Sequence, residues 1–119
     1  MHGAFHINGV TGPDEYSALS DDNVYTNLMA KLNLAGAVDV TDRHLELARR
    51  AGVTEAEVAA WRDAAAVMHI PYDDELGGHP QAMNFTHYDE WDFAATKPQD
   101  YPLLLNVSYF DLYRKQVVK

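Results

Sequence analysis

The sequence predicts a mostly α-helical chain, in which three helices are followed by a long irregular segment. Two observations support this class. Through the first half of the chain, apolar residues recur at spacings of three and four, the pattern of amphipathic helices. From Ile70 to Leu103 that periodicity vanishes, while proline, glycine and aromatic residues become frequent. The chain therefore divides into a helical part and an irregular part.

A polar loop opens the chain and leads into the first predicted helix. Gly9, Gly12 and Pro13 break any regular pattern, and the run 17–22 offers several helix-capping side chains. The first helix is expected between Asn23 and about Val38. Its apolar residues should form a single buried stripe. The members of that stripe are Val24, Tyr25, Leu28, Met29, Leu32 and Ala35.

A second, shorter helix is predicted to start at Thr41, which would act as its cap. Gly52 supplies the left-handed residue that ends many helices. Between these two positions, four apolar residues are expected to face inward. They are Leu45, Leu47, Ala48 and Ala51.

Thr54 and Glu57 match the capping box, in which the two side chains satisfy each other's backbone amides at the start of a helix. This third helix should extend through Trp61 to Met68 and end by Pro71. Trp61 occupies an apolar helical position and is expected in the core. Short loops join the three helices.

The irregular segment is longer than the roughly 12 to 15 residues usual for structureless loops in compact domains, and such loops are commonly functional. Its aromatic side chains include Tyr88, Trp91, Phe93 and Tyr101. Sugars dock on flat aromatic faces, so these residues could line a sugar site. A packed loop is an equally good interpretation.

Composition excludes several functions. The net charge of −9 and the scarcity of clustered Lys and Arg argue against a nucleic-acid partner. There is no cysteine, so disulfides and thiolate metal sites are excluded. No apolar run approaches the roughly 20 residues needed to span a bilayer, and the first ten residues lack the pattern of a signal peptide. A cytoplasmic protein that does not act at a membrane is expected.

No metal is expected either. His2, His6, His79 and His87 could in principle contribute to a site, but no His-Glu-x-x-His motif is present and scattered loop histidines are commonly solvated. The run 73–75 is acidic but lacks the glycine and ligand spacing of a calcium loop. Both features are predicted to be ordinary polar loops.

The run Gly12-Pro13-Asp14-Glu15-Tyr16 is the most informative feature for function. Pro13 stiffens the turn, and the two adjacent carboxyls must point in different directions. One of them could face a cleft as a general acid, whose pKa would be raised by burial or by a nearby like charge. The alternative is a surface turn at a helix start, where carboxylates complement the helix dipole.

Both ends of the chain suggest an excerpt. The proposed site has few residues before it, and the run from Asp111 to Lys119 reads as a helix that stops without a terminator. We therefore expect residues 1–119 to be a fragment of one catalytic domain, with no second domain.

Three blocks of the chain closely resemble glycoside hydrolase family 65. The first is Gly9-Val10-Thr11-Gly12-Pro13-Asp14-Glu15-Tyr16, the second is Asn23-Val24-Tyr25-Thr26-Asn27 with Met29-Ala30, and the third runs from Tyr109 to Lys119. The family contains inverting disaccharide phosphorylases for maltose, trehalose, kojibiose or nigerose, and some hydrolases. The resemblance implies that the chain is a partial (α/α)6 barrel.

The resemblance also implies a reaction. Glu15 would protonate the glycosidic oxygen, while inorganic phosphate attacks the opposite face of the sugar. The products would be β-glucose 1-phosphate and glucose, with phosphate as co-substrate and no cofactor. Lys119 matches a lysine that holds the sugar undergoing cleavage, and Tyr25, Thr26 and Asn27 would lie near the cleft. A phosphorylase needs no second carboxylate as base, whereas a hydrolase must activate water.

Two positions depart from the family pattern. Ser17 stands where many members have His, and the stretch 77–81, which shapes the acceptor side of the cleft, differs from maltose phosphorylases. The substrate is therefore open. The resemblance places the phosphate-binding residues outside this chain, so the polypeptide alone should be inactive, and it is compatible with a homodimeric parent enzyme. The alternatives are a trehalase-like hydrolase of the same family and, from a different class, a non-catalytic helical sugar-binding module.

Overall fold

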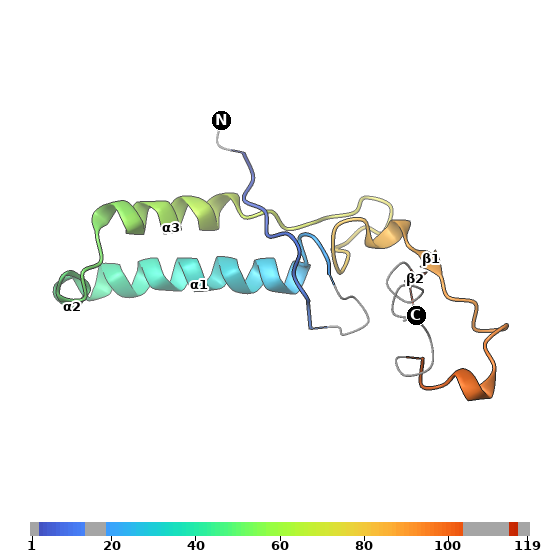
Figure 1. Ribbon diagram of the computed structural model, residues 1–119. Coiled ribbons are helices and arrows are strands. Elements are labelled where there is room, and N and C mark those ends of the chain that lie inside the picture. The colour runs from blue at the N-terminus through green and yellow to red at the C-terminus, as the bar shows by residue number, and fades with distance from the viewer. Residues whose placement is uncertain (1–2, 14–18, 104–114, 117–119) are drawn as a thin grey trace.

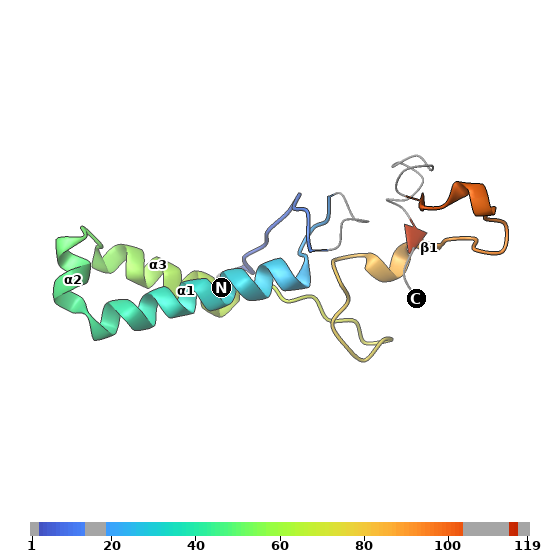
Figure 2. The ribbon, with the colours of Figure 1, turned by 90° about the horizontal axis from the view of Figure 1, so that it is seen from below.

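The computed structural model describes residues 3–13, 19–103 and 115–116, and it is an elongated, mostly helical body. Its principal extents are 62 × 30 × 18 Å. Two long antiparallel helices, α1 and α3, lie side by side, with the short α2 at one end of the pair (Figure 1). The irregular segment extends away from the other end, as the view from below also shows (Figure 2).

Helix α1 spans Val24–Arg43. Asn23 caps it, because its Oδ1 accepts hydrogen bonds from the backbone N–H (3.0 Å) and the hydroxyl (3.2 Å) of Thr26. The helix does not stop near Val38 as predicted. It continues through Thr41, so the expectation that Thr41 caps the next helix is wrong. An exposed ion pair between Arg43 and Asp39, one turn apart, lies in this added turn.

Helix α2 spans Leu45–Arg50 and follows α1 after the single residue His44. Leu45 and Leu47 are exposed, not inward-facing as predicted, because this short helix has only the ends of α1 and α3 beside it. Gly52 has φ +81°, which confirms the predicted left-handed stop.

Helix α3 spans Glu55–Val67 and begins with the predicted capping box. Glu57 donates its backbone N–H to the Thr54 hydroxyl (3.2 Å), and its carboxylate accepts from the Thr54 backbone N–H (2.9 Å). The helix ends at Val67, ahead of Pro71, and Met68 is its C-cap. Trp61 is half-buried and not a core residue.

The face of α1 that packs on α3 is not the predicted stripe. Its least exposed residues are spaced alternately by four and three, and they are Asn27, Lys31, Leu34, Val38 and Thr41. Most of the predicted stripe lies on a face turned away from α3, where Leu32 is 62% exposed and Tyr25 is 53% exposed. One partner helix covers only one face, so a second apolar face is left open to solvent.

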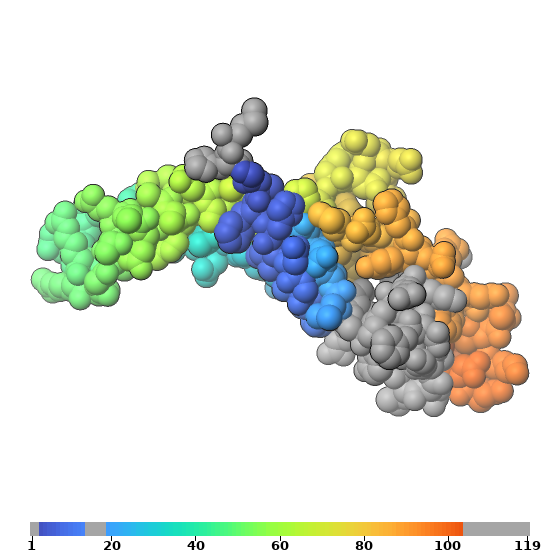
Figure 3. All heavy atoms as spheres, turned by 45° about the horizontal axis from the view of Figure 1, so that its top comes forward, coloured from blue at the N-terminus to red at the C-terminus, as the bar shows by residue number. Residues whose placement is uncertain are grey.

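The core is small, and its helical part lies between α1 and α3. The buried apolar residues of the described chain are Val38, Val58, Ala65, Met68, Ala82 and Leu103, of which the last two belong to the irregular segment. The N-terminal segment closes one side of the core, because Phe5 forms a parallel bridge with Met68 through Phe5 N–H to Val67 O (2.8 Å) and His69 N–H to Phe5 O (2.9 Å). The segment crosses the body where the helical pair meets the irregular part (Figure 3).

The irregular segment contains two short 3₁₀ helices, η1 (Phe85–His87) and η2 (Pro98–Asp100). Strand β1 (Asp89–Glu90) pairs in parallel with β2 (Lys115–Gln116). The strand at 115–116 contradicts the expected helix through this part of the chain, because a long-range pairing with β1 overrides the local pattern. The rest of the run 111–119, namely 111–114 and 117–119, lies outside the described residues.

Among the described residues, no helix combines the length and apolarity needed to cross a bilayer.

The 119-residue polypeptide, prepared alone, is expected to self-associate or to melt without a sharp transition. Contiguous exposed apolar surface favours association, and α1 presents Tyr25, Leu28, Met29 and Leu32 at 40–62% exposure. Light scattering during size-exclusion chromatography and calorimetry will measure both properties. A monomer that unfolds in one cooperative transition would contradict this expectation.

Candidate active site

The loop that carries the proposed acid, residues 11–19, is clamped where it starts and ends. Val10 and Ser20 form an antiparallel bridge with N–H to O distances of 3.0 and 2.8 Å. One residue further from the loop on each side, Gly9 N–H donates to the Asp21 carboxylate (2.8 Å). These bonds bring the two ends of the loop together at one point of the fold.

Gly12 lies directly against the cap of α1. A Cβ atom at this position would lie 2.8 Å from Cγ of Asn23, and closer still to its Nδ2. Asn23 is itself buried and holds the first turn of α1. Only glycine therefore fits between the loop and the helix N-terminus, which fixes the loop against α1.

Asp22 sits between the loop and α1, fully buried, with φ +47°. Its backbone N–H donates to Ile7 O (2.9 Å). Its carboxylate accepts from His6 Nδ1 (2.7 Å), from Asn27 Nδ2 (2.9 Å) and from the Ile7 N–H (3.3 Å). Burial alone raises the pKa of this carboxyl, but the hydrogen bonds from His6, Asn27 and Ile7 outweigh it and lower the pKa below its ordinary value. Asp22 is therefore a buried anion at neutral pH.

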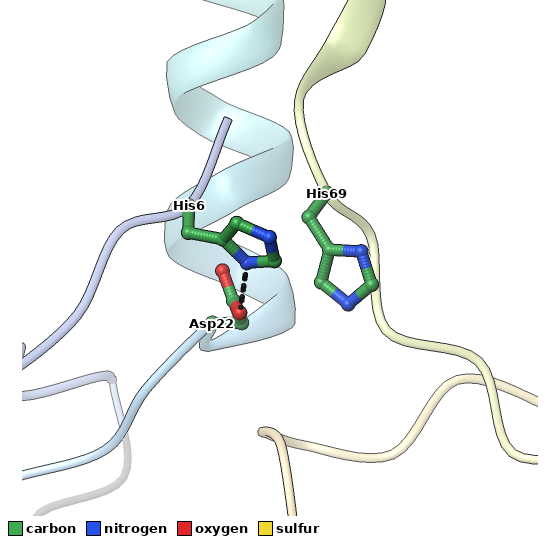
Figure 4. A group of neighbouring side chains, drawn as sticks. All are labelled: His6, Asp22 and His69. Atoms are coloured by element: carbon green, nitrogen blue, oxygen red, sulfur yellow. Dashed lines mark hydrogen bonds and ion pairs between the residues drawn. The ribbon is translucent and has the colours of Figure 1, made fainter. Parts of the chain in front are cut away.

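Asn27 extends this network to the chain after α3. Its side-chain amide donates one hydrogen bond to Asp22 and a second to the carbonyl of His69 (2.8 Å). The ring of His69 lies beside that of His6, with centroids 4.8 Å apart (Figure 4). Three segments thus meet at Asp22: the N-terminal segment, the start of α1 and the stretch that follows α3.

The residues predicted for the site fall into three groups. Tyr25 lies half exposed on the first turn of α1, and Thr26 uses its hydroxyl in the helix cap. Asn27 is fully buried, and its Oδ1 has no partner among the described residues. Glu15 and Lys119 lie outside the residues that the structure describes.

In the described part of the chain, one group of side chains could hold a metal ion. It consists of His6, Asp22 and His69, whose ligand atoms lie within 4.8 Å of one another. The 2.7 Å separation of His6 Nδ1 and Asp22 Oδ2 is that of a charge-assisted hydrogen bond. The arrangement is thus a hydrogen-bonded network. The absence of a metal requirement stays a prediction.

The aromatic residues of the irregular segment contact their own neighbourhood. Trp91 donates from Nε1 to the Thr96 hydroxyl (2.8 Å), and Tyr88 packs edge-on against Phe85 with centroids 6.0 Å apart. These contacts match the packed-loop interpretation. Phe93 and Tyr101 are 40% and 48% exposed and remain accessible.

A cavity of about 270 Å³ lies between the three helices, near Asp42, Val53, Val58 and Arg62. It is at the α2 end of the body, whereas the clamped loop is at the N-terminus of α1 (Figure 1). The cavity therefore lies away from the candidate site.

Asp22 and His69 are the functional candidates that sequence patterns missed. The sequence offers Asp22 among the capping side chains of positions 17–22, but Asn23 makes the cap. A fully buried aspartate at positive φ carries no periodic signal, because its partners at positions 6, 27 and 69 are brought to it by the fold.

Comparisons with known proteins agree with the family resemblance of the sequence. The family model of the glycosyl hydrolase family 65 central catalytic domain matches residues 1–119. An uncharacterized glycosyl hydrolase of Mycobacterium tuberculosis is 56% identical over 118 residues, which cover 99% of this chain and 15% of that protein. An alpha,alpha-trehalose phosphorylase of Geobacillus stearothermophilus is 42% identical over 125 residues, covering 98% of this chain and 16% of that protein.

A solved structure described as a candidate kojibiose phosphorylase from the human microbiome superposes with a TM-score of 0.77 at 29% identity, covering 98% of this chain and 17% of that one. The matched family model makes the chain a segment of a carbohydrate-active catalytic domain. The chain belongs to glycoside hydrolase family 65. It spans about one sixth of the length of the relatives it matches.

Proposed function

We propose that this chain is part of an inverting disaccharide phosphorylase, with Glu15 as its general acid. The enzyme cleaves an α-linked glucose disaccharide with inorganic phosphate and releases β-glucose 1-phosphate and glucose. The observation that carries the proposal is the match of the whole chain to the family's catalytic domain, together with 42% identity to a trehalose phosphorylase. A phosphorylase activity for relatives of this kind makes phosphate the co-substrate.

The clamped loop suits the role of the acid. A general acid must stay within hydrogen-bond reach of the departing oxygen, so its backbone has to be held in place. The bridge between Val10 and Ser20 and the close approach of Gly12 to Asn23 hold both ends of the segment on which Glu15 lies. Both contacts position the backbone of this segment and do not depend on the side chain of the acid.

Helices α1 and α3 are, in this proposal, one hairpin of an (α/α)6 barrel. The open apolar face of α1 around Leu28 and Leu32 would pack on neighbouring helices of the parent enzyme. The half-exposed ring of Tyr25 and the first-turn Thr26 would lie near the cleft, and Lys119 would hold the sugar undergoing cleavage. Asn27 has both amide hydrogens in use, so we assign it to holding Asp22 in place.

A hydrolase of the same family is the second candidate. It is favoured by the 56% identical mycobacterial relative, which is described as a glycosyl hydrolase. Such an enzyme would use the same acid but would also need a carboxylate base to activate water. The non-catalytic sugar-binding module loses support, because the matching family model is that of a catalytic domain.

The test is an assay of the complete parent polypeptide on glucose disaccharides of different α-linkage, each with and without inorganic phosphate. Phosphate-dependent formation of glucose 1-phosphate supports the phosphorylase and identifies its substrate. Release of glucose alone, independent of phosphate, would replace it by the hydrolase. No release from any disaccharide would favour the binding module.

A further inference from the structure

Asp22 does more than the usual buried carboxylate, because it joins both ends of the acid-bearing loop to α1. Its backbone N–H donates to the Ile7 carbonyl, and its carboxylate accepts hydrogen bonds from His6, Ile7 and Asn27. Residues before the loop and residues after it therefore donate to the same carboxylate. The side chain is fully buried and the backbone adopts φ +47°, a conformation that aspartate tolerates better than most residues. A residue kept in such a conformation is held there by its surroundings.

The network also ties the loop to the second long helix. Asn27 connects Asp22 to the His69 carbonyl, and Phe5 pairs with the backbone on both sides of Met68. The Asp22 carboxylate is therefore the point at which three separate segments are held in register. Removing its charge would leave three hydrogen-bond donors facing a group that cannot satisfy them all.

We propose that Asp22 is a positioning residue for catalysis, with His6 and Asn27 as its partners, and that it fixes the loop on which Glu15 delivers its proton. This inference rests on the proposed function. Asp22 does not act on the sugar. It sets the place of the acid relative to α1, where a misplacement of about 1 Å can cost on the order of 100-fold in rate.

The test compares two substrates of the complete parent enzyme that differ in their need for an acid. In phosphorolysis of a disaccharide, the bond from C1 to the leaving oxygen breaks, and that oxygen must gain a proton as C1 bonds to phosphate. In α-glucosyl fluoride, phosphate bonds to C1 as the C1–F bond breaks and fluoride leaves with the electron pair, so little protonation is needed. A misplaced acid should therefore slow the first reaction far more than the second.

Asp22→Asn is expected to lower kcat on the disaccharide about 100-fold while leaving KM and the rate on α-glucosyl fluoride much less affected. Asp39→Asn, which changes an exposed aspartate of α1, is the control and should keep both rates. Equal losses on the two substrates, or no loss, in folded Asp22→Asn would overturn the inference.

A second variant keeps the test decisive if Asp22→Asn does not fold. His6 is partly exposed, so His6→Gln should fold and show the same preference for fluoride at a smaller loss. An unchanged ratio of the two rates in His6→Gln would then count against the proposal. Glu15→Gln, measured in parallel, separates this inference from the proposed function. If Glu15→Gln shows no preference for the fluoride, the proposed function fails. If Glu15→Gln shows that preference and the Asp22 and His6 variants do not, only the role of Asp22 fails.

Discussion

Glu15→Gln in the complete parent enzyme is expected to lower kcat on unactivated disaccharides by about 10²- to 10⁴-fold, the usual contribution of a positioned general acid. Glutamine keeps the shape of the side chain but has no proton to give to the leaving oxygen. Sugar binding should be largely retained, so the loss should appear in kcat and not in KM. Steady-state kinetics of phosphorolysis will measure both constants.

Two matched variants make this result specific. Glu75→Gln changes an exposed carboxylate in the loop after α3 and should leave the activity unchanged. Asp14→Asn tests the neighbouring carboxyl of the same block. If Asp14→Asn abolished turnover while Glu15→Gln retained it, the assignment of the acid would be wrong.

Asn27→Ala is expected to destabilise the parent enzyme by about 3 kcal/mol, because it removes one hydrogen bond to a buried charge and leaves the His69 carbonyl without its partner. Asn27 is fully buried, so water cannot replace the lost bonds. Urea unfolding, followed by fluorescence, should show a lower midpoint with an unchanged slope.

Asn33→Ala provides the control for this prediction. Asn33 is an asparagine on the same helix but is exposed, so its replacement removes a similar side chain without opening a buried network. Its midpoint should match that of the unaltered enzyme. Equal midpoints for the two variants would show that the Asp22 network contributes nothing to stability.

Local features of the fold were predictable from the sequence. The capping box of Thr54 and Glu57 and the left-handed Gly52 depend only on residues within one or two turns, and the structure confirms both. Thr41 shows the limit of such reasoning. Threonine at a cap and threonine inside a helix look alike in sequence, and here the helix runs through it to Arg43.

Which face of α1 is buried could not be read from apolar spacing. The predicted stripe is largely exposed, because α3 covers the face that carries Asn27, Leu34 and Val38. A helix with neighbours on several sides carries more than one buried stripe, and periodicity alone does not say which neighbour covers which.

The candidate site was predicted only in part. The block around Glu15 and the first turn of α1 were identified from residue types and family resemblance. The anion that supports them was not, because Asp22 is linked to His6 across 16 positions and, through Asn27, to His69 across a further 42. Contacts this distant in the chain leave no periodic pattern.

The most direct test of the central claim is proton NMR of the sugar products that the complete parent enzyme forms from its disaccharide. Inverting phosphorolysis should give glucose 1-phosphate that appears first as the β-anomer and only when inorganic phosphate is present. Formation of the α-anomer, or release of two free glucose molecules at the same rate without phosphate, would contradict it.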